Sequence, residues 1–175
     1  MSEYRFTLRF DVTTVDVGPH DVVELLGASG CDDALAGIGR AGRVALAFGR
    51  EAGSAMEAVV SAIRDVRRAL PGALLLEATP DLVGVTELAG IVGRSRQNMR
   101  MLLQSRDASA PAPVHEGNSS LWHLAAVLVW LRDEKSYPIP DELLDVARTT
   151  MQIDLAIDRG HLDGAMQKEI AALLA

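Results

Sequence analysis

The sequence predicts an α+β protein with a sheet domain, a small helical module and a helical tail, and three observations support this prediction. Hydrophobic residues alternate strictly near the N-terminus, which indicates a half-buried strand. Several later segments instead repeat hydrophobic residues at helical spacing. The segment TPDLVG, residues 79–84, separates a part that mixes strands and helices from a mainly helical part. We therefore expect three units, residues 1–80, 81–135 and 136–175.

The first unit has the expected element order βαββαβ, which is typical of the ferredoxin-like fold. Its first strand is YRFTLRF, residues 4–10, where the aromatic residues and Leu8 share one face. The elements that follow are a short helix within 20–30, strands within 32–40 and 43–48, a helix at 54–70 with Ser54 as its N-cap, and a strand at 73–78.

The second unit is expected to hold helices at about 86–92 and 95–105, a hairpin around Gly117 and Asn118, and a helix at about 124–134. The tail predicts two helices separated near Gly160. Two hydrophobic stripes lie side by side in the first of them: Leu143, Val146, Ile153 and Ile157, and Leu144, Ala147, Met151 and Leu155. Because these stripes are wider than one core requires, we expect a homodimer.

Composition and charge exclude several classes of protein. Hydrophobic residues make up 49% and charged residues 23%, as in a globular protein. The longest wholly apolar run, residues 124–131, is far shorter than the roughly 20 residues of a membrane span. Without an apolar signal segment at the N-terminus, we expect a cytoplasmic protein that makes no membrane contact. The net charge of −7 argues against non-specific coating of nucleic acid.

No motif predicts enzyme activity, a cofactor or a metal. GIGRAG, residues 37–42, has the spacing of a dinucleotide-binding loop, but a strand follows it where that loop requires a helix. A glycine-rich turn between strands is the better interpretation. The four histidines are scattered without metal-ligand spacing, and Cys31 has no cysteine or basic run beside it, so we expect it to be buried.

The aromatic face of residues 4–10 allows one nucleic-acid alternative, because RNA-binding sheets stack bases on strand aromatics. The two helices of the first unit must cover one sheet face, however, and this apolar face is the one they would cover. The opposite face carries Arg5, Thr7 and Arg9 with small residues, and it is left open to a ligand, a protein partner or a second copy.

Positive charge is concentrated in one place. Residues 81–123 hold four basic and four acidic residues, and all four basic ones lie between Arg94 and Arg106. We expect Thr86 and Ser95 to cap two helices joined by a turn at Gly93. In the second helix Met99, Leu102 and Leu103 form the buried stripe, and the opposite face carries Gln97, Arg100, Met101 and Gln104. In the major groove, arginine side chains form hydrogen bonds with the edge of guanine, and glutamine side chains with the edge of adenine.

The segments TELAGIVGRSRQNMRMLL and PAPVHEGNSSLWHLAAVLVWL resemble the winged helix-turn-helix of the MerR superfamily, in its excisionase and prophage-regulator branch, over about residues 82–133. The resemblance implies that the helix starting at Ser95 enters the major groove and that His115–Ser120 is the wing. It also implies that Trp122 and Trp130 are core residues. Arg94 departs from the family, which has an apolar residue there; it either adds a phosphate contact or marks a turn that packs differently.

Together, pattern and resemblance predict a sequence-specific protein that binds double-stranded DNA, which we expect to be a transcriptional regulator. The alternative is a protein-interaction module, such as an antitoxin or adaptor, in which DNA contact is secondary or lost. The expected DNA contacts are Thr86, Arg94, Ser95, Arg96, Gln97, Asn98, Arg100, Gln104, His115, Asn118, Ser119 and Ser120.

Overall fold

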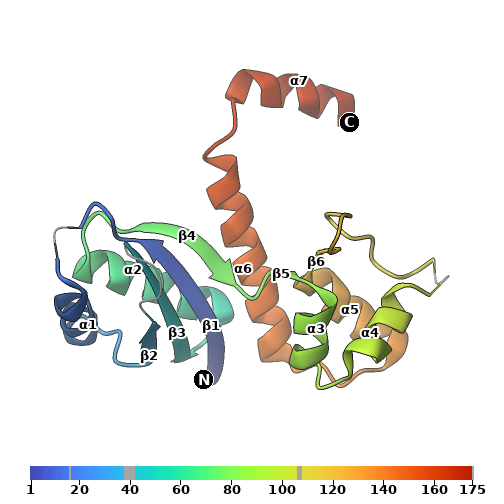
Figure 1. The fold of residues 1–175 in the computed structure, drawn as a ribbon, viewed down its shortest axis with the longest axis horizontal. Helices are drawn as coiled ribbons and strands as arrows, with labels where there is room; N and C mark the ends of the chain where they lie inside the picture. Colours follow the sequence, from blue (N-terminus) through green and yellow to red (C-terminus); the bar gives the residue numbers. More distant parts are fainter. Residues whose placement is uncertain (16, 38–41, 106–107, 175) are drawn as a thin grey trace.

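A computed structural model of the chain describes residues 1–15, 17–37, 42–105 and 108–174, with the backbone alone at 19 and 20. The fold is mixed α+β, as predicted. A sheet with two helices forms one region, a cluster of short helices forms the other, and one long helix runs between them (Figure 1). Arg106 and most of the GIGRAG segment lie outside the described residues.

The sheet region contains a four-stranded antiparallel sheet with the strand order β2-β3-β1-β4. Its elements are β1 (Ser2–Asp11), α1 (Pro19–Ala28), β2 (Ala34–Gly37), β3 (Arg43–Ala52), α2 (Ala55–Ala69) and β4 (Leu74–Thr79). Helix α2 begins where the sequence predicts, since the Glu57 N–H donates to Ser54 Oγ at 3.1 Å.

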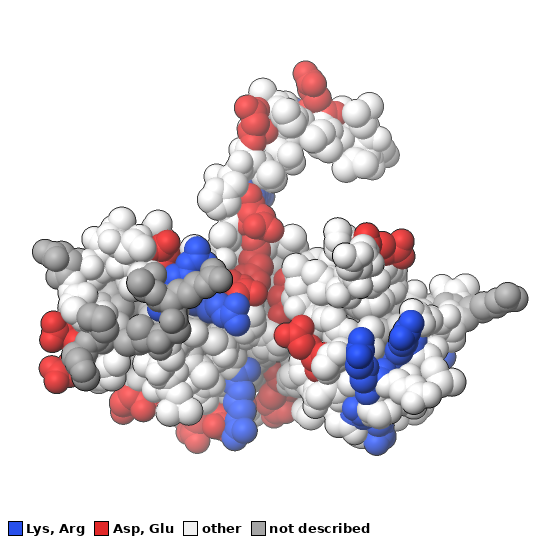
Figure 2. All heavy atoms as spheres, in the orientation of Figure 1, with Lys and Arg blue, Asp and Glu red and all other residues white. Residues whose placement is uncertain are grey.

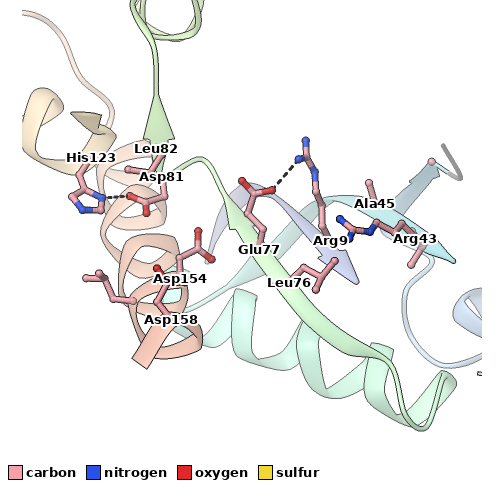
Figure 3. A pocket seen from close by; sticks show the side chains of 13 residues that line it. Arg9, Arg43, Ala45, Leu76, Glu77, Asp81, Leu82, His123, Asp154 and Asp158 are labelled. Atoms are coloured by element: carbon pink, nitrogen blue, oxygen red, sulfur yellow. Dashed lines mark hydrogen bonds and ion pairs between the residues drawn. The ribbon is translucent and has the colours of Figure 1, made fainter. Parts of the chain in front are cut away.

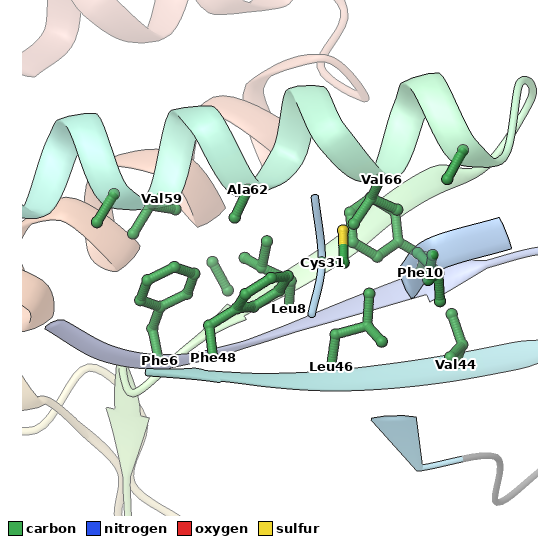
Figure 4. Close-up of a cluster of buried hydrophobic side chains, with 14 of the residues drawn as sticks. Phe6, Leu8, Phe10, Cys31, Val44, Leu46, Phe48, Val59, Ala62 and Val66 are labelled. Carbon is green, nitrogen blue, oxygen red and sulfur yellow. The ribbon is translucent and has the colours of Figure 1, made fainter. Parts of the chain in front are cut away.

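The aromatic side chains of β1 are core residues and not a stacking surface. Phe6 and Phe10 are buried beneath α2 (Figure 4), and Phe6 stacks on Phe48 with ring centroids 5.2 Å apart. Cys31 is buried in the same core, as predicted. The RNA-binding alternative therefore loses the aromatic surface on which it depended.

The second region has its own hydrophobic core. Its elements are β5 (Leu82–Val83), α3 (Val85–Ile91), α4 (Arg96–Leu103), β6 (Trp122–His123) and α5 (Leu124–Lys135). The short strands β5 and β6 pair antiparallel. Leu88, Met99, Leu128 and both tryptophans are buried together, and the family resemblance had implied core positions for the tryptophans.

The tail forms α6 (Asp141–Arg159) and α7 (Gly164–Leu174). Helix α6 packs against both regions: Val146 and Ile153 join the core of the sheet region, while Leu144 and Ala147 join the second core. Both hydrophobic stripes of α6 thus pack mainly within one chain, and their width is no longer an argument for a dimer. None of the described helices is long and apolar enough to span a bilayer.

Candidate nucleic-acid interface

A tight turn joins α3 to α4. Gly93 has φ +65°, a left-handed conformation that glycine adopts without strain. The Arg94 N–H donates to the Ala89 carbonyl at 2.8 Å and closes the end of α3. The Asn98 N–H donates to Ser95 Oγ at 3.1 Å, so Ser95 is the N-cap of α4, as predicted.

The prediction that Thr86 caps α3 is wrong. Helix α3 begins at Val85, with Gly84 at the N-cap position and Glu87 in the first turn. The Gly84 N–H donates to the Glu87 carboxylate at 3.2 Å. This bond satisfies one of the backbone N–H groups at the start of the helix, which have no partner within the helix. The helix begins before the predicted position because β5 ends at Val83 and α3 follows it after one residue, Gly84. Thr86 is therefore a helical residue with an exposed side chain.

Helix α4 separates a buried face from a polar one. Met99 is 0% exposed and Leu102 and Leu103 are half-buried, so the predicted apolar stripe packs into the second core. The predicted opposite face, Gln97, Arg100, Met101 and Gln104, is exposed, and so is the neighbouring Arg96. Basic side chains lie on this part of the molecule and also over the sheet region, while acidic side chains follow α6 (Figure 2). The geometry of α4 thus presents cations and amides together.

A groove of about 390 Å³ lies between α3, α4 and the loop at residues 117–120. Seven of the twelve predicted contact residues line it: Thr86, Arg96, Arg100, Gln104, Asn118, Ser119 and Ser120. Glu87 also lines the groove, but its carboxylate accepts the Gly84 N–H. The groove therefore combines two guanidinium groups and one carboxylate with hydroxyl and amide groups.

Arg94 and Asn98 face a different neighbour, the connector between α5 and α6. The Arg94 guanidinium lies 5.3 Å from the centre of the Tyr137 ring, a cation–π geometry. The Tyr137 hydroxyl donates to Asn98 Oδ1 at 3.3 Å. Arg94 thus packs on the Tyr137 ring, a contact that the sequence analysis did not predict. Gln97 and Ser95 are exposed on α4 but do not line the groove.

The predicted hairpin at 115–120 is closed by a single bridge. His115 pairs with Leu121, and the Val114 N–H donates to the Leu121 carbonyl at 2.8 Å. The regular strand pairing lies outside this loop, between β5 and β6, where β6 directly follows Leu121. The His115 side chain turns toward Gly117, so that an added Cβ at position 117 would lie 2.8 Å from His115 Nε2.

The two tryptophans anchor the segment that leads into this loop. Trp122 Nε1 donates to the Pro111 carbonyl at 3.1 Å, and Trp130 Nε1 donates to Ser109 Oγ at 3.0 Å. Because both rings are fixed in the core, these bonds tie Ser109 and Pro111 to that core.

A second set of charged residues was missed by sequence reasoning. Asp81, only 2% exposed, has Oδ1 at 2.7 Å from His123 Nδ1. Asp154 accepts the Ala78 N–H at 2.7 Å. Burial raises the pKa of Asp154 to about 6, the Ala78 N–H opposes this shift, and the nearby carboxylates of Asp81, Glu77 and Asp158 add to it. These groups are far apart in sequence, so only the fold reveals the cluster (Figure 3).

Within the described ranges, no group of three or more His, Cys, Asp or Glu side chains is placed to hold a metal ion. Two cavities with charged side chains in their lining are the α4 groove and the one beside Asp154. No protein-family model, no curated protein and no solved structure matches the chain.

Proposed function

We propose that the chain is a sequence-specific protein that binds double-stranded DNA, a transcriptional regulator that reads the major groove with α4. The observation that carries this proposal is the groove beside α4, where Arg96 and Arg100 meet the polar loop of Asn118–Ser120. Such a set of cations, amides and hydroxyls is the set that pairs with phosphates and base edges. The acidic remainder of the chain would suppress indiscriminate binding.

The shape of this surface suits a duplex. An exposed helix fits the major groove, which is about 12 Å wide. With α4 there, one sugar–phosphate strand would lie in the groove between α4 and the 117–120 loop. The loop would then act as a wing on the backbone or the adjacent minor groove. Gln97 and Arg100 would meet bases, and Arg96, in the first turn of α4, would meet phosphate.

Two finer fold assignments belong to the same proposal. The strand order β2-β3-β1-β4 and the element order βαββαβ support a ferredoxin-like sheet domain. The α3–α4 turn, the β5–β6 pair and the loop between them support a winged helix-turn-helix of the excisionase type in the MerR superfamily. A cytoplasmic location accords with this function.

We further propose that the protein acts as a homodimer, with α7 as the contact. No residue of α7 is buried, and Met166, Ile170, Leu173 and Leu174 are large exposed apolar residues at helical spacing. A twofold pair of α4 helices would read two half-sites, which one helix cannot do. Sedimentation at micromolar concentration should show a dimer, and the double variant Ile170→Lys, Leu173→Lys should sediment as a folded monomer.

Selection of bound fragments from a random pool of duplex DNA tests the DNA-binding proposal. The wild-type chain and an Arg148→Ala control should enrich the same motif. Arg148 is an exposed arginine of α6, outside the groove. Failure of the wild-type chain to enrich any sequence would reject the proposal and favour the protein-interaction alternative.

A further inference from the structure

A cavity of about 660 Å³ lies at the junction of the two regions, away from the α4 groove. One wall is the open face of the sheet, with Arg9, Ala45 and Glu77. The facing wall is the C-terminal half of α6, and β5–β6 contribute Leu82 and His123 (Figure 3). Its volume is in the range of small-molecule sites, which occur preferentially between domains.

The cavity is bordered by apolar side chains that the fold leaves uncovered. Leu76 of β4, Leu82 of β5 and Leu155 of α6 line it, with exposures of 37%, 48% and 46%. These leucines come from three elements and line different parts of the cavity: Leu82 lies beside Asp81, and Leu76 lies toward Arg43 (Figure 3). Apolar surface that gathers in a hollow, with polar groups at its rim, marks a binding site more often than scattered exposed leucines do.

Two of the charged pairs around the cavity are already formed. Arg9 Nη1 lies 2.9 Å from Glu77 Oε2, and His123 contacts Asp81. Asp154 and Asp158 remain, one turn apart on the same face of α6. Neither forms an ion pair with a side chain that the structure describes. Asp154 is half-buried and accepts only a backbone N–H, so a cation beside it would relieve the cost of its burial.

The lining selects the chemistry of the ligand. Leucines beside carboxylates favour an organic cation over a hydrated metal ion. Arg43 lies at the opposite end of the cavity from Asp154 (Figure 3) and disfavours a second positive charge there. A ligand with one cationic end and an apolar body fits both the carboxylates at one end of the cavity and Arg43 at the other.

We propose that this cavity binds an amphiphilic organic monocation, an alkyl ammonium or guanidinium, with its charged end at Asp154 and Asp158 and its chain on Leu76, Leu82 and Leu155. The site is separate from the α4 surface, so it stands whether or not the chain binds DNA.

Isothermal titration of the full chain at neutral pH tests this proposal with three probes of equal chain length: hexylammonium, hexanoate and 1,6-hexanediammonium. Hexylammonium should bind saturably with one site per chain, and the other two should bind at least about tenfold more weakly. The double variant Asp154→Asn, Asp158→Asn should lose at least about tenfold of the hexylammonium affinity. Asp145→Asn, an exposed α6 carboxylate outside the cavity, should behave as wild type.

Asp158→Asn alone provides the same test at an exposed residue whose replacement spares the fold, and circular dichroism checks every variant. Absence of saturable hexylammonium binding up to about 10 mM would overturn the proposal. So would hexanoate binding as tightly as hexylammonium, or undiminished hexylammonium affinity in the folded Asp158→Asn and double variants.

Discussion

Arginines occupy opposite environments in the two regions of this molecule. In the sheet region Arg50 is 9% exposed, and its Nε and Nη2 both donate to Asp33, at 2.7 and 3.0 Å. It also donates to Asp65 at 2.8 Å and to Ser61 at 3.0 Å. On α4, Arg96 and Arg100 are exposed. Arg100 Nε donates to Gln104 Oε1 at 3.3 Å, and neither arginine forms an ion pair with a described residue.

This difference distinguishes structural from binding charge. A buried guanidinium whose donors are all directed to protein acceptors holds elements together, and it has nothing left for a ligand. An exposed guanidinium beside a polar groove adds little to stability and keeps its donors for a partner. The two regions should therefore respond to the same substitution in opposite ways.

The largest effect is expected at Arg50. Arg50→Ala removes the nearly buried cation that Asp33 and Asp65, both partly buried, share, so the free energy of unfolding should fall by about 3 kcal/mol. Urea denaturation measures this loss. DNA affinity, compared under conditions where the variant is folded, should be unchanged. A loss below about 1 kcal/mol would show that Arg50 does not hold this region together.

Smaller effects, on binding alone, are expected on α4. Arg100→Ala and Gln97→Ala should each weaken binding to the selected site by about 1–3 kcal/mol and relax preference at one base position per half-site. Their urea midpoints should remain close to wild type. Fluorescence anisotropy with matched and mismatched duplexes measures the effect. Unchanged affinity and preference in both variants would remove α4 as the reading element.

At the junction of the two regions, Asp154→Asn should be more stable than the wild type, and the difference should grow as the pH rises. The pKa of Asp154 is raised to about 6, so the folded protein holds this proton more tightly than the unfolded chain does. In the wild type, the contribution of Asp154 to the free energy of unfolding is therefore complete below about pH 4, and it is lost as the pH rises through about 6. Asparagine keeps an acceptor for the Ala78 N–H without the charge.

The expected gain for Asp154→Asn is about 1 kcal/mol at pH 7.5, after allowance for solvent screening, and close to zero at pH 4. Thermal denaturation of both proteins across this pH range measures the difference. A gain that is the same at every pH, or a loss at pH 7.5, would contradict the assigned environment of Asp154.

The smallest effect is expected at Arg96. Arg96→Ala should weaken binding to all duplexes alike and reduce the slope of log affinity against log salt by about one. Ser95→Ala, at the neighbouring cap, should instead cost about 1 kcal/mol of stability, so its binding must be corrected for folding. A change of base preference in Arg96→Ala would place that side chain on a base rather than a phosphate.

Local patterns predicted local features of this fold. Alternation at residues 4–10 predicted the buried face of β1, and Ser95 with Gly93 predicted the start of α4 and its turn. The predicted N-cap of α3 was wrong because threonine is a more typical N-cap residue than glycine. The start of the helix is instead set by the two-residue strand β5. Such a short strand has no periodicity to detect.

Features that depend on distant pairs were not predictable. Tyr137 meets Arg94 only because the connector before α6 returns to α4, and Asp154 meets Ala78 only because α6 runs along β4. The hydrophobic stripes of α6 were visible in the sequence, but a pattern cannot tell whether a second core or a second chain covers them. The α4 face was found because its residues are neighbours on one helix.

Site-specific photocrosslinking to the selected duplex tests the central claim most directly. A photoreactive phenylalanine analogue would replace Gln97, Asn118 or Arg148 in turn, and the crosslinked nucleotides would be mapped. Position 97 should crosslink to bases in the major groove of the motif, position 118 to the flanking backbone or minor groove, and position 148 to nothing. Crosslinks from position 148 equal to those from 97 and 118, or none from 97, would contradict DNA reading by α4.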